Sequence, residues 1–296
     1  MKNIRLLAMA KINLALDVIE RLDNGYHNLE MIMQSVTLAD TIQIRKTFGN
    51  DITLSTNMHW LPIDEKNLVY KAADFLKREY KIKYGMDIYI NKKIPMCAGL
   101  AGGSTDCAAT LVGIRNLFGL KVSNNKLLEI GKEFGADVPF CIKRGTYLAE
   151  GIGEKLSPLP QMPHCYILIV KPSVSISTGE IFQSLDLSKI KERPDIEKLT
   201  YYLKNQNIEG IATNLCNVLE IVSIQKYPII KDIKESMLES GALGSLMSGS
   251  GSAVFGIYKS KKQAINSKNF LHKKLNINEI YVSKPFNVYN GYEVQQ

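Results

Sequence analysis

The stretch "IPMCAGLAGGSTDCAATLVGIRNLFGL", residues 94–120, joins a glycine-rich loop directly to an apolar pattern of helical period. Gly99, Gly102 and Gly103 permit backbone angles and close approaches that side chains would block. Backbone amides at a helix N-terminus attract anions, so the loop is a candidate phosphate-binding site. Taken alone, it is more readily interpreted as a simple strand-to-helix turn, because such glycine patterns recur widely.

The helix after this loop is predicted from apolar residues that recur along one face. Ser104 or Thr105 is placed to cap its N-terminus, and Gly119 is placed to end it. Neither G-x-x-x-x-G-K-[ST] nor G-x-G-x-x-G occurs here, so the usual P-loop and dinucleotide fingerprints are excluded.

The length of the chain, 296 residues, suggests about two domains, each large enough to bury a core. Lys and Arg number 37 against 29 Asp and Glu, a net charge of +8 with no block long enough to form a charged tail. This excess fits a solvated basic surface, and it equally fits a cleft that attracts a polyanionic small molecule or nucleic acid. Charge alone does not separate these interpretations.

Cysteine usage and the N-terminal stretch indicate a cytoplasmic protein. The five cysteines form no C-x-x-C pair and have no neighbouring His pair, so we expect reduced thiols. Lys11, Asn13 and Asp17 interrupt the N-terminal apolar run too early for a secretory signal. No segment approaches the roughly 18 apolar residues of a membrane span, so no membrane partner is expected.

Strand and helix patterns follow one another along the chain, which predicts an α+β protein. In the first half we expect strands at 3–7, 12–18, 41–46, 51–56 and 86–91. Helices are expected there at 67–80, 105–120 and 124–135. In the second half we expect helices near 194–206, 226–240 and 260–274, with strands at 243–247, 252–258 and 279–283.

A proline-rich stretch, "SPLPQMPHCYILIVKPS" at residues 157–173, indicates a domain boundary. We therefore place one domain at residues 1–160 and a smaller α+β domain at residues 161–296.

Two further stretches carry residues that are unusual for their surroundings. "GSLMSGSGSAVFG" (244–256) is a second Gly/Ser loop, and "AKINLALDV" (10–18) places a lysine and an asparagine in an apolar strand. Together with the first loop and "GADVPF" (135–140), they resemble the signatures of the GHMP small-molecule kinases, whose P-x-x-x-G-L-[AG]-G-S stretch forms the ATP phosphate loop. The similarity spans nearly the whole chain in the family order. Four motifs at family spacing are a specific signal, whereas any one alone would be weak.

The resemblance implies the GHMP kinase fold, with an N-terminal ribosomal-S5-like α/β domain, a C-terminal ferredoxin-like α+β domain and the active site between them. It implies an ATP-dependent kinase that uses Mg²⁺, although the metal ligands stay unassigned. "GYHNLE" (25–30) favours the members that phosphorylate the 2-hydroxyl of a cytidyl diphosphate sugar alcohol in non-mevalonate isoprenoid biosynthesis. The expected partners are ATP and that alcohol, without nucleic acid, and the chain is expected to be a monomer or weak homodimer.

Three positions depart from the family pattern. Ala101 and Thr105 stand where many members have Gly and Ser, and both are small enough to leave the phosphate site intact. Ser252 stands where a proline commonly follows the second glycine, which would alter the stiffness of that loop. The resemblance assigns the ATP phosphates to Pro95, Met96, Cys97, Ala98, Gly99, Leu100, Ala101, Gly102, Gly103, Ser104 and Thr105.

Phosphoryl transfer to an alcohol needs a group that accepts the hydroxyl proton. Asp137 follows a predicted helix, and Pro139 is expected to forbid helix continuation and to fix an extended turn. The matching aspartate of the family is the base, so we assign that role to Asp137; without this context, a turn or capping aspartate is the plainer interpretation.

Lys11 lies in an apolar strand pattern, where an unpaired ammonium is costly to bury, so it needs a partner such as Asp137 or a phosphate. Beside Asp137 it would keep the carboxylate ionised and stabilise charge on the substrate oxygen. The alternative is a lysine that extends to solvent from an edge strand.

The acceptor site is assigned to polar and aromatic residues from both halves. Asn13 shares a strand face with the lysine and would bond to substrate, or is simply an edge-strand polar residue. Tyr26 and His27 suit stacking and edge-on hydrogen bonding to a base, Phe182 would be the other face of a cytosine sandwich, and Thr178 a nearby polar contact. Without the family pattern, such aromatic residues more often pack a loop or a core.

Two other functions remain open. One is a sister kinase with the same ATP loop and a homoserine- or mevalonate-like acceptor. The other is a basic RNA-binding module, suggested by the net charge and by "KREYKIKYG" (77–85), although no RNP1-like segment is present.

Overall fold

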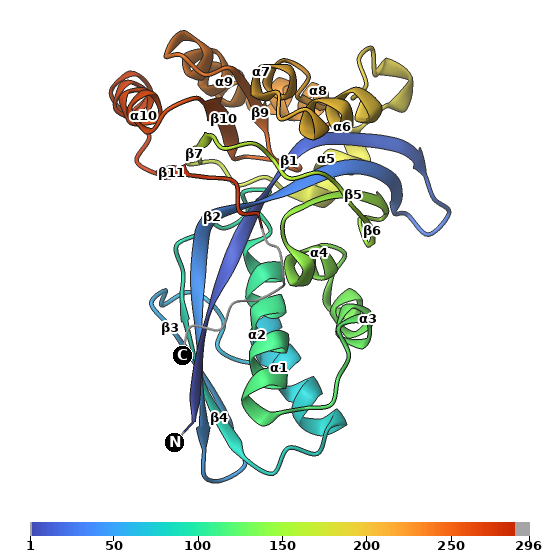
Figure 1. Ribbon diagram of the computed structural model, residues 1–296, viewed down its shortest axis with the longest axis vertical. Helices are drawn as coiled ribbons and strands as arrows, with labels where there is room; N and C mark the ends of the chain where they lie inside the picture. The colour runs from blue at the N-terminus through green and yellow to red at the C-terminus, as the bar shows by residue number, and fades with distance from the viewer. Residues whose placement is uncertain (1, 288–296) are drawn as a thin grey trace.

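The structure, a computed structural model, describes residues 2–287 as two β-sheets with helices packed against each (Figure 1). The larger sheet contains β1 (Asn3–Arg21), β2 (His27–Thr47), β3 (Ile52–Thr56), β4 (Gly85–Asn91), β5 (Thr146–Gly151), β6 (Lys155–Pro158) and β8 (Cys216–Asn217). Its main strand order is β3-β4-β2-β1-β8, and β5 pairs with both β2 and β6. The smaller sheet contains β7 (Tyr166–Val170), β9 (Gly244–Met247), β10 (Val254–Tyr258) and β11 (Ile280–Ser283), in the order β11-β7-β10-β9.

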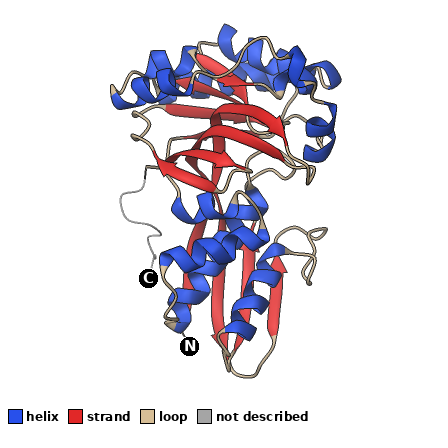
Figure 2. Cartoon of the chain, turned by 90° about the vertical axis from the view of Figure 1, so that its right-hand side faces the viewer, coloured by secondary structure: helices blue, strands red, loops and turns tan. Residues whose placement is uncertain are grey.

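Four helices from the first half of the chain lie on one side of the lower part of the large sheet, three of them in contact with its strands and α3 packed on α2 and α4 (Figure 2). They are α1 (Leu68–Glu79), α2 (Gly102–Phe118), α3 (Asn124–Phe134) and α4 (Val138–Lys143). The α2 helix is the central one, because it packs on α1, α3, α4, β1 and β2. Its residues from Thr105 to Ile114 are all buried, so the loop before it is fixed to the core of the molecule.

The second half of the chain forms a layer of helices at the end of the molecule farther from the N-terminus (Figure 1). These helices are α5 (Thr178–Ser184), α6 (Ile196–Lys204), α7 (Ile208–Thr213), α8 (Glu220–Lys226), α9 (Ile229–Glu239) and α10 (Lys261–Leu275). The small sheet packs onto the upper part of β1 and β2, where Ile12 and Ile32 share a buried apolar cluster with Ile167 and Phe255. The two halves of the chain therefore share a core.

The predicted mixed α and β composition is confirmed, and most predicted helices begin and end within a few residues of the observed ones. The predicted strands at 3–7 and 12–18 are both confirmed as strand, but the break expected between them is wrong, because β1 runs unbroken from Asn3 to Arg21. The strand at 41–46 is the end of the much longer β2. The division after residue 160 stays a prediction: the chain passes between the sheets from β6 to β7, and β8 returns to pair with β1.

The expected extended turn at Pro139 is also wrong. Pro139 is the second residue of α4, a position near a helix N-terminus where its missing N–H breaks no helical bond. Across residues 2–287, none of the helices combines the length and the apolar character that crossing a bilayer requires.

Candidate active site

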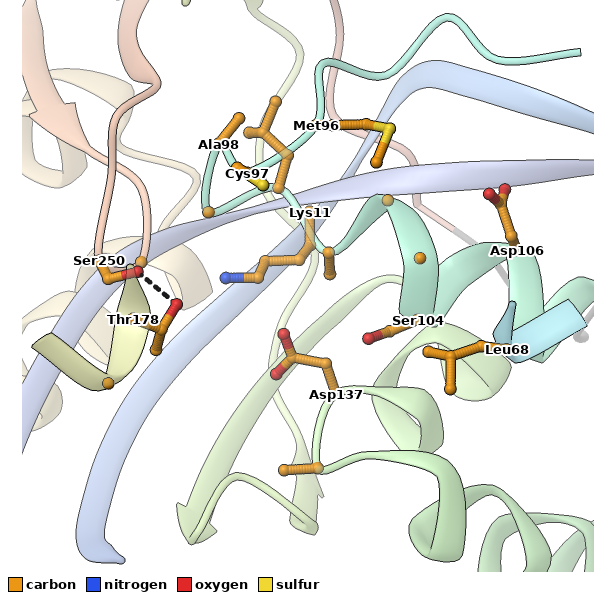
Figure 3. Close-up of a pocket in the computed structure, with 18 of the residues that line it drawn as sticks. Lys11, Leu68, Met96, Cys97, Ala98, Ser104, Asp106, Asp137, Thr178 and Ser250 are labelled. Carbon is orange, nitrogen blue, oxygen red and sulfur yellow. Dashed lines mark hydrogen bonds between the residues drawn. The ribbon is translucent and has the colours of Figure 1, made fainter. Parts of the chain in front are cut away.

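One cavity of about 810 Å³ contains nearly all of the predicted site residues (Figure 3). Its walls come from β1, the β1–β2 turn, the glycine-rich loop, the start of α4, α5 and the loop between β9 and β10. Of the residues assigned from the sequence, only Asn13 and Thr105 do not line it. The structure therefore brings together residues that lie more than 200 positions apart.

The glycine-rich loop turns sharply before α2 begins. Cys97, Gly99 and Ala101 have positive φ values of 50°, 70° and 57°. Gly102 and Gly103 are the first residues of α2 and have no positive φ, so the expectation that all three glycines serve unusual backbone angles is correct for Gly99 alone. Ala101 occupies a left-handed conformation, in which its methyl group is unfavourable and a glycine is not.

The prediction that Ser104 or Thr105 caps α2 is wrong. The N-cap residue is Ala101, and no side chain caps the helix. The first N–H groups of a helix lack intrahelical partners, so this uncapped N-terminus presents amide donors and the positive end of the helix dipole at the cavity. Ser104 instead points its hydroxyl into the cavity, on the side that faces Asp137 (Figure 3).

The loop between β9 and β10 packs directly on the glycine-rich loop. The Oγ of Ser248 donates a hydrogen bond to the carbonyl oxygen of Gly99 at 2.9 Å. A Cβ on Gly99 would lie 2.0 Å from the carbonyl oxygen of Ser248, far inside van der Waals contact. The two backbones touch, so Gly99 is required here for space as well as for its positive φ.

Lys11 and Asn13 lie on β1 between irregularities in its pairing with β2. The register shifts between Met9 and Lys11 and again between Asn13 and Ala15. Such bulges re-aim side chains. Lys11 is only 5% exposed, so the alternative of an edge-strand lysine that reaches solvent is wrong. Its backbone N–H donates to Leu100 at 3.1 Å, which fixes the glycine-rich loop to β1.

The observed partner of the Lys11 ammonium is Asn13. The Nζ of Lys11 donates to Oδ1 of Asn13 at 2.6 Å, and the same oxygen accepts the N–H of Gly249 at 3.1 Å. Asn13 is fully buried behind Lys11, so the edge-strand interpretation of Asn13 is wrong. Lys11 and Asp137 extend toward each other into the cavity (Figure 3), but within residues 2–287 they form no ion pair.

Asp137 is the N-cap residue of α4, yet its side chain makes no capping hydrogen bond. Gly135, which follows α3, lets the chain reverse before α4 begins. The carboxylate points into the cavity toward Lys11 (Figure 3). Asp137 does lie in a turn, as the alternative interpretation expected, but the capping half of that interpretation is wrong, and the carboxylate is available for a ligand.

A buried ion cluster of Lys92, Asp40 and Asp106 holds the two ends of the glycine-rich loop in place. The ammonium of Lys92 bonds to Asp40 and, at 2.7 Å, to Asp106 in the first turns of α2. Burial alone would lower the pKa of Lys92, but the charges of Asp106 and Asp40 outweigh it and raise that pKa above its ordinary value. Asp40 also accepts the N–H of Ile94 at 2.8 Å. Both ends of the loop are thus tied to one cluster.

The aromatic residues line the cavity from the β1–β2 turn and from α5. The rings of His27 and Phe182 are 5.0 Å apart at 35°, while Tyr26 is 60% exposed. Burial, and then the charge of Arg21, lower the pKa of His27, which favours a neutral imidazole with one donor and one acceptor. The hydroxyl groups of Thr178 and Ser250 form a hydrogen bond at 2.9 Å (Figure 3).

One group of cavity residues was not predicted from the sequence. It precedes and begins α1, beyond the glycine-rich loop, and consists of Leu61, Pro62, Lys66, Asn67 and Leu68. Asn67 caps α1 through the N–H of Val69 and donates to the carbonyl of Pro62 at 2.7 Å, which holds this segment in place. Its only signal in the sequence is an asparagine before a helix, and that pattern says nothing about a ligand.

The fold and this loop-and-helix site define a class of small-molecule kinases. The GHMP kinases N terminal domain matches residues 67–145, and the GHMP kinases C terminal domain matches residues 199–277. This chain therefore belongs to the GHMP kinase family, whose fold has two sheets of the kind described above. Membership of this family decides against the basic RNA-binding module.

The relatives are more specific. The chain is 46% identical over 286 residues to 4-diphosphocytidyl-2-C-methyl-D-erythritol kinase of Lachnospira eligens, covering 97% of this chain and 99% of the relative. It is 48% identical over 288 residues to the protein of the same name from Alkaliphilus oremlandii, covering 97% and 98%.

Solved structures agree in fold. A crystal structure of 4-(cytidine 5'-diphospho)-2C-methyl-D-erythritol kinase superposes with a TM-score of 0.82 at 27% identity, covering 96% of this chain and 100% of that one. A homoserine kinase from Cytophaga hutchinsonii gives 0.76 at 23% identity, covering 100% and 98%, and supports the fold alone.

Proposed function

We propose that this chain transfers the γ-phosphoryl group of ATP to the 2-hydroxyl of 4-diphosphocytidyl-2-C-methyl-D-erythritol, a step of non-mevalonate isoprenoid biosynthesis. The observation that carries the proposal is the placement of Lys11 and Asp137 in the middle of one cavity. The uncapped start of α2 lies on one side of them, and the His27–Phe182 aromatic pair forms another wall. The names and the similarity of the relatives supply the identity of the acceptor.

ATP is expected to bind with its phosphates at the start of α2. Amides at this helix N-terminus suit anionic oxygens, and the Lys92 cluster holds the loop in position. The segment that includes Leu61, Pro62 and Leu68 then provides an apolar surface for the adenine ring. The γ-phosphoryl group is directed toward Lys11 and Asp137.

Asp137 accepts the proton of the acceptor hydroxyl as that oxygen attacks the γ-phosphorus. The ammonium of Lys11 stabilises negative charge on the attacking oxygen and on the transferred group. Asn13 holds this ammonium through a neutral acceptor, so the positive charge is not cancelled by a neighbouring carboxylate. Asn13 thereby acts on the reaction through Lys11, while direct contact of Asn13 with substrate stays a prediction.

Mg²⁺ fits this site as an ion that arrives with ATP. Within residues 2–287, no group of three His, Cys, Asp or Glu side chains is arranged to hold a metal ion. Mg²⁺ in kinases is held largely by phosphate oxygens and water, so such a group is not needed. The Ser104 hydroxyl is the side chain that we propose to contact it. When bound, the ion neutralises charge on the phosphates.

The acceptor is tested by measuring ADP release with a panel of alcohols. The panel contains the cytidyl compound, its uridyl analogue, 2-C-methyl-D-erythritol 4-phosphate, homoserine and mevalonate. We expect the cytidyl compound to have much the highest kcat/KM. Equal turnover of the bare sugar phosphate, homoserine or mevalonate would refute the acceptor and leave only the kinase class.

A further inference from the structure

Asn217 is a buried residue just behind the cavity wall, and its side chain bonds to the loop between β9 and β10 and to the start of α8. It is 4% exposed and forms the end of the two-residue strand β8. Its Nδ2 donates to the carbonyl oxygens of Met247 at 2.9 Å and Gly249 at 2.8 Å. Its Oδ1 accepts the N–H of Leu219 at 3.0 Å, which turns the chain into α8.

Gly249 is held on both sides of its backbone. Its carbonyl oxygen accepts from Asn217, and its N–H donates to Oδ1 of Asn13 at 3.1 Å. That Asn13 oxygen also accepts the ammonium of Lys11. A continuous series of hydrogen bonds therefore runs from Asn217 through Gly249 and Asn13 to Lys11.

The space around Gly249 makes this series sensitive to small displacements. Gly249 has a φ of 57°, and a Cβ there would lie 3.2 Å from backbone atoms of Gly99 and 3.4 Å from the Nζ of Lys11. If Gly249 moves away from Asn13, the amide that helps to fix the Asn13 oxygen is lost. If it moves the other way, it meets Lys11 or the glycine-rich loop.

The anchor of the series belongs to the same sheet as Lys11. β8 pairs in parallel with β1 through Ala15 with Cys216 and Leu16 with Asn217. The N–H of Val218 also donates to the carbonyl of Leu16 at 3.0 Å. Asn217 is therefore fixed relative to the strand that carries Lys11, and it sets the distance between that strand and the loop at 248–252.

We propose that Asn217 is a positioning residue of the phosphoryl-transfer reaction: by holding Gly249 against Asn13, it fixes the Lys11 ammonium at the position where the transferred group develops charge. The inference rests on the proposed function. It assigns Asn217 no contact with either substrate, because the residue does not line the cavity. Its loss should therefore lower kcat and leave KM for ATP and for the acceptor nearly unchanged.

Two substitutions separate this role from a local structural one. Asn217→Asp keeps the oxygen that accepts the Leu219 N–H but removes both donors to the loop, whereas Asn217→Ala removes all three bonds. Each should lower kcat by about tenfold to a hundredfold, the range expected when a catalytic group is misplaced by about 1 Å. The control is Asn207→Ala. It removes the side-chain oxygen that caps α7 by accepting the N–H of Gly210, away from the cavity, so kcat should stay unchanged.

The deciding measurement is a double-mutant cycle with Lys11→Ala. If Asn217 acts through Lys11, adding Asn217→Asp to Lys11→Ala should lower the residual kcat by less than about twofold. Full additivity, or a wild-type kcat in both Asn217 variants, would overturn the inference while leaving the proposed function intact. A wild-type chain that phosphorylates none of the acceptor alcohols would instead overturn the proposed function, and this inference with it.

Discussion

Lys11 shows how a single buried charge is kept available for catalysis. Its ammonium donates to one neutral oxygen, that of Asn13, at 2.6 Å, and it faces Asp137 across the cavity without pairing with it. A buried ammonium is unfavourable without partners, so the site gains when anionic phosphate oxygens enter. Because no permanent ion pair neutralises the ammonium, its positive charge can interact with the reacting phosphoryl group.

Replacing the two central side chains should separate chemistry from binding. Asp137→Asn keeps the shape of the side chain but removes the proton acceptor, so kcat should fall by roughly 10²-fold or more. Lys11→Ala should lower kcat by a similar factor through loss of charge stabilisation. Steady-state kinetics and ATP titration measure the two effects. Near-normal turnover by Asp137→Asn would rule out the base assignment.

His27 and Phe182 should contribute differently to recognition of the base. His27→Phe keeps a ring next to Phe182 but loses the edge hydrogen bond, so the ratio of kcat/KM for cytidyl over uridyl acceptors should fall by about tenfold, equivalent to about 1.4 kcal/mol. Phe182→Ala serves as the matched control, because lost stacking of about 1 to 3 kcal/mol should weaken both acceptors alike. If His27→Phe keeps the wild-type ratio, another group reads the base.

At this scale, the sequence identified the residue types but not all of their contacts. The lysine, the aspartate and the aromatic residues were predicted from motifs, and the structure places them in one cavity. The pairing of Lys11 with Asn13 depends on the bulges of β1, which a sequence pattern of period two does not reveal. Asn217 carried no motif at all, since its role depends on a contact with residues 30 and 32 positions away.

The two glycine-rich loops are elements whose function depends on their backbones. Gly99 is restricted by the Ser248 carbonyl oxygen and by its positive φ, whereas Gly103 lies in a helix and its nearest neighbour to a new Cβ would be Leu68 at 3.9 Å. The first glycine therefore has a structural requirement that the second lacks. Both line the cavity.

Alanine at these two positions should give opposite results. Gly99→Ala should destabilise the protein, because the left-handed conformation alone costs about 1 to 2 kcal/mol before the contact with Ser248 is added. Gly103→Ala should keep or raise the unfolding free energy, by up to about 1 kcal/mol, but bind ATP roughly tenfold more weakly. Thermal unfolding without ligand and ATP titration measure these changes. Wild-type ATP affinity in Gly103→Ala would place the phosphates elsewhere.

Two of the elements that the sequence predicted closely, α1 and α3, are buried on one face. α1 and α3 have apolar residues at helical spacing and side-chain caps from Asn67 and Ser123, so their ends were predicted closely. The first part of β2 was missed because Met31 to Val36 are all buried, and a strand buried on both faces shows no alternation. The short α4 was missed because its proline was taken for a breaker.

The whole molecule is held together across the predicted domain boundary. Ile44 of β2 and Val170 of β7 belong to one buried cluster. After β11, the N–H of Phe286 donates to Ser35 at 2.8 Å, and Lys284 accepts from Thr37 at 2.9 Å. Residues 1–160 alone would expose the apolar face that the second half covers.

Thermal unfolding should therefore occur in one transition, with ATP raising its midpoint because the ligand binds the folded state. Differential scanning calorimetry measures this directly. The isolated segment 1–160 should show no cooperative transition and no ATP binding. Two resolved transitions in the full chain, or a folded 1–160 segment, would show that the halves are independent domains.

The contact between Gly99 and Ser248 also limits how the length of this chain can change during evolution. Surface loops usually accept insertions and deletions, and the turn around Phe48, a residue that is 82% exposed, has room for them. The loops at 97–101 and 248–251 have no room for insertions, because their backbones pack directly against each other. An insertion in one would need a matched change in the other, 149 residues away. Length differences among descendants of this protein should therefore collect at exposed turns, and the two loops should be inherited as a fixed pair.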